Sequence, residues 1–319
     1  MNKIIIPIVV NFILNYLVKN KILPGDVYFV NIIITAVLII IIGTKYLDKP
    51  DMSLFNNVDD NVNGNVIDEK MAYYYPLILS VSLLTIYFII KYAGSYKRII
   101  LKVLFFISIT SSLINILPFD KTFIFLLSLL WFMFDYNTSN QHQELKIYIN
   151  NVIAILVALS SMKMMDITNT KTAIILLIGL FLFDIFWVFG SKKIIQNFEN
   201  DTELSTPVLP TNSKSVSVME TVALNVDSPI LLTYFNNSPD KPMILGLGDI
   251  IIPGLFIKTL VNLPIYYNTS ILSYVFGLVS AIYYAVTTEK GQPALLYIVP
   301  ALVVPTVARA YFNNENIYI

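Results

Sequence analysis

The sequence predicts an all-α polytopic membrane protein from its composition, its mean hydropathy and the length of its apolar runs. Hydrophobic residues make up 56% of the 319 residues, charged residues only 13%, and the mean hydropathy is +0.70. A soluble domain of this length would carry about twice that charged fraction. The apolar residues also gather into runs that are long enough, or nearly long enough, to cross about 30 Å of hydrocarbon.

The composition excludes several classes of function. The chain has no cysteine, which excludes disulfides, iron–sulfur clusters and thiol nucleophiles, and its single histidine, His142, excludes a multi-histidine metal site. Its formal net charge is zero, so no overall basicity indicates a nucleic-acid partner. We therefore expect no metal, no cofactor and no nucleic acid, and a lipid bilayer as the surroundings.

Nine apolar runs are predicted to be membrane helices. The fourth run is short, and only Phe119, Asp120 and Lys121 separate it from the third. In chain order the nine runs are 27–44, 72–92, 99–118, 122–134, 147–163, 172–190, 243–264, 271–287 and 291–309.

An additional apolar segment, 4–18, precedes these runs. It follows Lys3 and fits the core of a signal peptide, a tenth helix or an interfacial anchor. Asn11 and Asn15 within it, and the lack of a small-residue cleavage pattern after it, favour a segment that stays in the membrane.

Two hydrophilic stretches interrupt the apolar runs. Residues 45–71 are rich in Asn and Asp and are predicted to form a mobile loop. Residues 191–242 form a longer loop, in which 197–213 are predicted to be disordered. Residues 228–235 have the composition of a β-strand, bounded by a proline and by Asn236.

Two aspartates lie deep inside separate apolar runs. Asp184 is about 18 Å from Lys171 and about 12 Å from Lys192 at the rise of a helix, too deep for its short side chain to reach water at the membrane surface. Asp249 lies midway between Lys241 and Lys258. A carboxylate at this depth costs several kcal/mol unless it faces a protein interior or a water pocket, so the two are predicted to share a site.

Small residues and prolines accompany both aspartates. Gly246 and Gly248 lack a Cβ, so a neighbouring helix or an extended substrate backbone can approach Asp249 closely. A third segment opens the last apolar run and is expected to form another wall of the same pocket, although its proline also fits the first position of a helix. This segment consists of Gln292, Pro293, Ala294 and Leu295.

A pair of carboxyl groups can perform hydrolysis without a metal. Two carboxylates about 3–6 Å apart cannot both ionise comfortably, so they titrate as a coupled pair that shares one proton near neutral pH. The ionised member takes a proton from water as a general base, and the protonated member polarises the scissile carbonyl.

At these residues the chain resembles a known family. Phe183-Asp184, Gly246-Leu247-Gly248-Asp249 and Pro293-Ala294-Leu295 resemble the three signature motifs of the presenilin and signal peptide peptidase intramembrane aspartyl proteases. The extended forms of the motifs, 184–190, 248–254 and 292–297, resemble signal peptide peptidase and not presenilin. The resemblance covers about 146–304, with a weaker likeness over 74–92.

The resemblance implies a nine-helix bundle, with the additional N-terminal segment beside it. Asp184 and Asp249 would be the catalytic residues on the sixth and seventh helices, with the neighbouring motif residues supporting the active site. The substrates would be single-pass membrane helices, typically of type II orientation, such as spent signal peptides. The resemblance also implies the endoplasmic reticulum membrane, and it leaves a homo-oligomer open.

The chain divides accordingly into three predicted parts. These are a hydrophobic segment of open role, 1–26, the N-terminal membrane helices, 27–171, and the catalytic membrane helices, 172–319, with the long loop 191–242. A helix hides its peptide bonds, so cleavage requires local unwinding, and an extended segment in lipid needs new hydrogen-bond partners. The predicted strand 229–235 would supply them by β-augmentation.

Two departures from the family pattern bear on activity. The family usually has tyrosine before the first aspartate, so Phe183 removes a hydroxyl from this position. The loop after Gly190 is also longer than usual by about a score of residues. Two other classes of function stay open: a transporter or channel in which Asp184 and Asp249 relay protons or bind cations, and a catalytically silent binder of membrane peptides.

Overall fold

The structure is a computed structural model that describes residues 3–24, 28–47, 66–137, 143–191, 218, 231–235, 243–288, 293–313 and 315. Every apolar run predicted from the sequence contains a helix. The helices are α1 (Ile5–Lys19), α2 (Tyr28–Lys45), α3 (Glu69–Tyr92), α4 (Lys97–Ile116), α5 (Lys121–Asn137), α6 (Gln143–Met164), α7 (Thr170–Ile185), α10 (Gly248–Thr259), α11 (Pro264–Thr288) and α12 (Leu295–Asn313). Two short helical turns join them: η3 (Gly94–Tyr96), and η5 (Phe186–Gly190), which continues α7.

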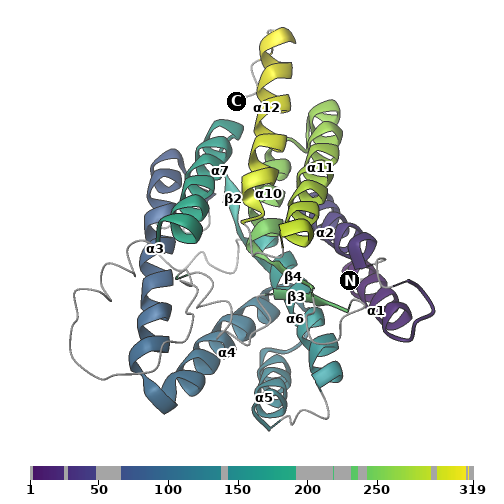
Figure 1. The fold of residues 1–319 in the computed structure, drawn as a ribbon, viewed down its shortest axis with the longest axis vertical. Helices are drawn as coiled ribbons and strands as arrows, with labels where there is room; N and C mark the ends of the chain where they lie inside the picture. The colour runs from purple at the N-terminus through teal and green to yellow at the C-terminus, as the bar shows by residue number, and fades with distance from the viewer. Residues whose placement is uncertain are drawn as a thin grey trace.

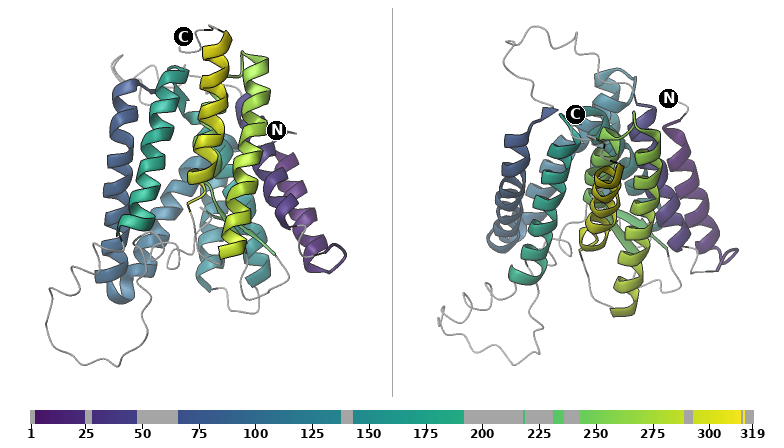
Figure 2. Two further views of the ribbon diagram at one scale, coloured as in Figure 1. Left: turned by 45° about the horizontal axis from the view of Figure 1, so that its top comes forward. Right: turned by 90° about the horizontal axis from the view of Figure 1, so that it is seen from above.

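The protein is an integral, multi-pass membrane protein. Within the described residues, seven helices are long and apolar enough to cross a membrane, namely α2, α3, α4, α6, α7 with η5, α11 and α12. The apolar helices α1 and α5 are shorter. Figure 2 shows α3, α7, α12 and α11 standing in a row, and each of these helices contacts the next.

The predicted helix 243–264 is wrong at both of its ends. Residues Met243–Gly246 form a strand, β4, and α10 begins only at Gly248 and ends at Thr259. Its 12 residues span about 18 Å, which is too short to cross a bilayer. The physical reason is that an uninterrupted apolar run fits a buried strand as well as a buried helix.

The short helix α10 lies in the middle of the bundle. Figure 1 shows it among the longer helices, and it contacts α2, α6, α7, α11 and α12. Its C-terminal end is fixed by Lys258, whose Nζ donates to the carbonyl oxygen of Met162 at 2.7 Å and pairs with Asp166 Oδ1 at 2.8 Å. This ties α10 to the end of α6.

Two small sheets accompany the helices. The predicted strand 228–235 is confirmed in the residues described there, because β3 (Leu231–Tyr234) pairs antiparallel with β4, with Leu231 opposite Gly246 and Tyr234 opposite Met243. The other sheet pairs β1 (Val66–Ile67) with β2 (Asp166–Ile167) in parallel. The predicted disorder at 197–213 lies outside the described residues. The predicted mobile loop at 45–71 is wrong at its end, because Val66–Ile67 form β1 and α3 begins at Glu69, and residues 48–65 of it lie outside the described residues.

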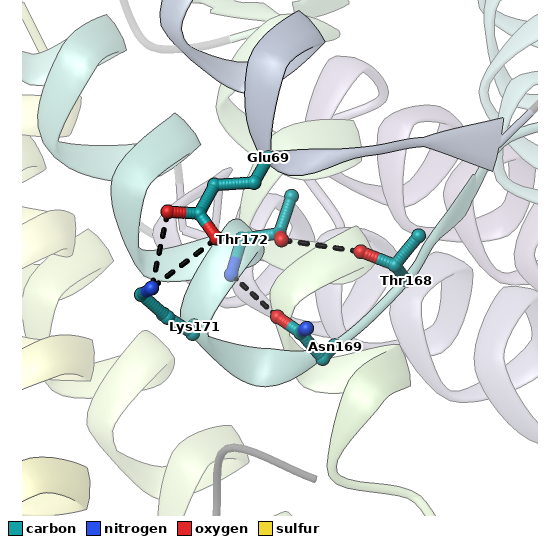
Figure 3. A network of polar contacts seen from close by, with 5 residues as sticks. All are labelled: Glu69, Thr168, Asn169, Lys171 and Thr172. Atoms are coloured by element: carbon teal, nitrogen blue, oxygen red, sulfur yellow. Dashed lines mark hydrogen bonds and ion pairs between the residues drawn. The ribbon is translucent and has the colours of Figure 1, made fainter.

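The start of α7 is held in a polar network (Figure 3). Asn169 caps the helix, since its Oδ1 accepts from the backbone N–H of Thr172 at 2.8 Å. The hydroxyls of Thr168 and Thr172 lie 3.1 Å apart, and Lys171 pairs with Glu69 of α3 at 3.0 Å. This network sets where α7 begins, and thereby the position of Asp184 about 21 Å further along the helix.

Candidate functional site

Asp184 lies on the interior face of α7. The buried residues Leu177, Leu180 and Asp184 follow one another at spacings of three and four, which places them on one side of a helix. Asp184 is only 5% exposed. The carboxyl group therefore faces the protein interior and not the lipid, as the cost of exposing it to hydrocarbon requires.

A π-helical turn begins two residues after Asp184, at Phe186. The turn η5 is held on two sides: the indole Nε1 of Trp187 donates to Ser80 Oγ of α3 at 3.0 Å, and Ser191 Oγ donates to the carbonyl oxygen of Trp187 at 2.6 Å. The Phe183 ring lies 6.4 Å from the Trp187 ring, between centroids. Single π-helical turns are frequent at functional sites because they redirect side chains within an otherwise regular helix.

Asp249 lies in the first turn of α10. This differs from the sequence interpretation, which placed it midway between Lys241 and Lys258 within a predicted membrane helix. The amino end of a helix carries partial positive charge and unpaired N–H groups, so a carboxylate is favoured there. Asp249 is also partly exposed, whereas Asp184 is buried. The two carboxyl groups thus come from different positions in their helices, the last turn of α7 and the first turn of α10.

The structure brings Asp184 and Asp249 together. Helix α7 contacts α10, and the two carboxyl groups are close enough to interact electrostatically. Within the residues that the structure describes, no three or more His, Cys, Asp or Glu side chains gather to hold a metal ion. Two neighbouring acids can share a proton and transfer it between them.

The two glycines before Asp249 have different surroundings. A Cβ added to Gly246 would lie 3.2 Å from Oδ2 of Asp249, whereas a Cβ added to Gly248 would meet no atom within 4 Å. Gly246 therefore leaves room for the carboxylate itself. Gly248 is exposed and leaves open space beside it.

The third predicted segment begins α12. Pro293 and Leu295 are buried and Ala294 is partly buried. Helix α12 contacts both α7 and α10, the helices that carry the aspartates. Pro293 precedes the helix, and its carbonyl oxygen accepts from the N–H of Leu296 at 3.2 Å. Gln292 lies outside the described residues.

Sequence reasoning did not select Tyr274 of α11. Its hydroxyl donates to the backbone carbonyl oxygen of Asp249 at 3.2 Å, and its side chain is fully buried. A hydroxyl in a membrane-spanning helix was the available signal, because such groups face a polar partner inside a bundle, but α11 carries many other hydroxyl side chains and the signal did not single out Tyr274. Tyr274 therefore fixes the first turn of α10 from the side of α11.

The strand β4, which precedes Asp249, has one edge that is not paired with β3. Antiparallel pairing alternates, so residues whose N–H and C=O turn away from the partner strand recur at every second position. Thr233 of β3 directs its N–H and C=O to the side chain of Asn151, away from β4. Opposite it, Ile244, and two residues later Gly246, must therefore direct their N–H and C=O away from β3.

The fold and the site together define a class of protein: a helical, multi-pass membrane protein with two neighbouring aspartates on helices that pack against each other inside the bundle. Residues 119–318 match the family model described as signal peptide peptidase. The chain belongs to the signal peptide peptidase family.

Individual relatives agree with the family match. Signal peptide peptidase of Mus musculus is 34% identical over 168 residues, and that of Homo sapiens 33% over 168 residues, each match covering 48% of this chain and 38% of the relative. A Schizosaccharomyces pombe protein with the name "Probable intramembrane protease" is 25% identical over 274 residues, which cover 78% of this chain and 81% of that protein. The chain thus matches well under half the length of the two mammalian relatives.

Proposed function

We propose that this protein is an intramembrane aspartic endopeptidase that hydrolyses peptide bonds within transmembrane helices. The observation that carries the proposal is the placement of two acids on helices that pack against each other: Asp184 on the interior face of α7, and Asp249 near it in the first turn of α10. Membership of the signal peptide peptidase family supports the same activity.

The proposed reaction is general acid and base catalysis by the two carboxyl groups. The ionised carboxylate accepts a proton from a water molecule as the water oxygen attacks the peptide carbonyl carbon, and the protonated carboxyl group donates to the carbonyl oxygen. In the second step the peptide C–N bond breaks, and the departing nitrogen receives a proton. Each turnover consumes one water molecule and returns the pair to its shared single proton.

The substrate would lie along β4 as an extended segment. A transmembrane helix must unwind before its peptide bonds can be attacked, and the freed backbone groups need new partners in the absence of water. Ile244 and Gly246 direct their N–H and C=O away from β3, and Gly246 adjoins the carboxylate of Asp249. A strand added there would pass the aspartates.

The narrower parts of the proposal concern substrates and location. Signal peptides and type II-oriented membrane segments are the proposed substrates, and the endoplasmic reticulum membrane is the proposed location. Both proposals rest on the resemblance of this chain to the family. We propose a homo-oligomeric state on the same ground. We also propose that the motif residues near the two aspartates shape the substrate site. These are Phe183, Gly246, Gly248, Gln292, Pro293, Ala294 and Leu295.

Labelling with an inhibitor tests the proposal. A photoreactive aspartic-protease inhibitor whose hydroxyl mimics the tetrahedral intermediate should crosslink to the purified protein. Either single change, Asp184→Ala or Asp249→Ala, should abolish the crosslink, because the hydroxyl needs both carboxyl groups. Proton or ion flux through reconstituted protein, without crosslinking or peptide cleavage, would instead support a transporter.

A further inference from the structure

The strand β3 has its second edge covered by an asparagine side chain. Asn151 of α6 donates from Nδ2 to the carbonyl oxygen of Thr233 at 2.7 Å, and its Oδ1 accepts from the backbone N–H of Thr233 at 2.9 Å. A primary amide carries one donor group and one acceptor, as a peptide unit does. Asn151 therefore occupies the place of a neighbouring β-strand.

A second asparagine, from α1, continues the same edge. Oδ1 of Asn15 accepts from the backbone N–H of Phe235 at 3.3 Å. Phe235 is two residues beyond Thr233, so the two backbone groups point to the same side of the strand. Asn15 and Asn151 together bond to the backbone at Thr233 and Phe235, on the edge of β3 that β4 does not use.

Asn11 joins the two asparagines to each other. Its Oδ1 accepts from Nδ2 of Asn15 at 3.1 Å and from Nδ2 of Asn151 at 3.2 Å. Its own Nδ2 donates to Thr35 Oγ1 of α2 at 3.3 Å. One carbonyl oxygen thus receives two amide donors, and the network connects α1, α2 and α6.

This network, which we call the asparagine clamp (Asn11, Asn15 and Asn151), is deeply buried. The three side chains are 2%, 1% and 1% exposed. A buried amide without partners is costly, whereas one whose donors and acceptors are matched holds a single geometry. The amide groups of Asn15 and Asn151 form hydrogen bonds with the backbone at β3. The clamp therefore fixes the strand as well as the helices.

We propose that the asparagine clamp is a positioning device for substrate, which closes the outer edge of β3 so that a substrate strand can add only to β4, beside Asp249. The inference rests on the proposed function. It also makes α1 part of the proteolytic unit, although α1 lies outside the residues that match the family model. An ion pair between Lys19, the last residue of α1, and Glu144, in the first turn of α6, also connects these two helices.

Cleavage-site mapping in single variants tests this role. Asn151→Leu removes both bonds to Thr233 at similar side-chain volume, and Asn15→Ala removes the single bond to Phe235. The matched control is Asn115→Leu in α4, since the Asn115 side chain donates to the carbonyl oxygen of Ser111 in its own helix. Each purified variant is given a single-pass substrate, and the products are identified by mass spectrometry alongside inhibitor labelling.

We expect Asn151→Leu to lower the cleavage rate about 10-fold, because displacement of a bound segment by a fraction of an ångström has effects of this order. Cleavage should also spread to neighbouring peptide bonds, while inhibitor labelling persists because the aspartates stay paired. Asn15→Ala should show the same change to a smaller degree. If Asn151→Leu does not fold, the result with Asn15→Ala decides the test. Asn115→Leu should cleave at the wild-type bond.

The inference is overturned if labelled, folded Asn15→Ala and Asn151→Leu proteins cut the same bond at the wild-type rate. It is also overturned if Asn115→Leu spreads the cleavage sites equally. A wild-type protein that neither cleaves nor binds the inhibitor would instead refute the proposed function, so the two failures can be told apart.

Discussion

The substitution Gly246→Ala changes the position of one carboxyl group without changing any charge. The added Cβ would lie 3.2 Å from Oδ2 of Asp249, closer than an ordinary carbon–oxygen contact. Gly246 has no positive φ, so the backbone accepts alanine and the only conflict is with the carboxylate. The carboxylate must therefore move by a few tenths of an ångström, away from its position near Asp184.

The expected loss of activity follows from that displacement. A misplacement of 1 Å can cost about 100-fold in rate, so half of that distance predicts about a 10-fold lower kcat, or roughly 1.4 kcal/mol in activation free energy. The assay is steady-state cleavage of a single-pass substrate by purified protein in detergent, with kcat and KM measured separately.

Gly248→Ala is the matched comparison. Its added Cβ would meet no atom within 4 Å, so the carboxylate keeps its place and the change acts on the space that an extended substrate would enter. We expect a raised KM with a smaller change in kcat. A wild-type kcat for Gly246→Ala, or an equal loss of kcat in both variants, would refute the reasoning.

Three further predictions concern the same site. Tyr274→Phe removes the hydroxyl that donates to the Asp249 carbonyl oxygen and should lower stability by about 1 kcal/mol, measured by thermal unfolding in detergent; an unchanged melting temperature would contradict it. Phe183→Tyr should retain or raise cleavage activity, and complete loss would show that the pocket has been misinterpreted. The rate of cleavage against pH should be bell-shaped, because only the singly protonated pair is active, and a flat profile would contradict the shared proton.

The position of Asp184 could be predicted from sequence because it depends on local pattern. An acid in a run of apolar residues must face the interior, and the capping residue Asn169 and the spacing of Leu177 and Leu180 set the face. The strand at β3 was predictable for the same reason, from β-branched and apolar residues next to a proline.

The surroundings of Asp249 were not predictable in the same way. The apolar run that contains it gives no periodic signal to separate the strand β4 from the helix α10, and the division depends on pairing with β3. Tyr274 and Asn151 reach the site from distant parts of the chain, so no motif links them to the aspartates. Asn11 and Asn15 were visible as polar residues four apart on one face of α1, but their partner was not.

The role of the acidic pair is tested most directly by cleavage with purified protein. Wild-type protein in detergent should cut a signal-peptide-like helix, and both Asp184→Ala and Asp249→Ala should abolish turnover while the helical content and melting behaviour stay close to wild type. Continued cleavage by either folded variant would contradict the account, because one remaining carboxyl group cannot act as both acid and base in the same step.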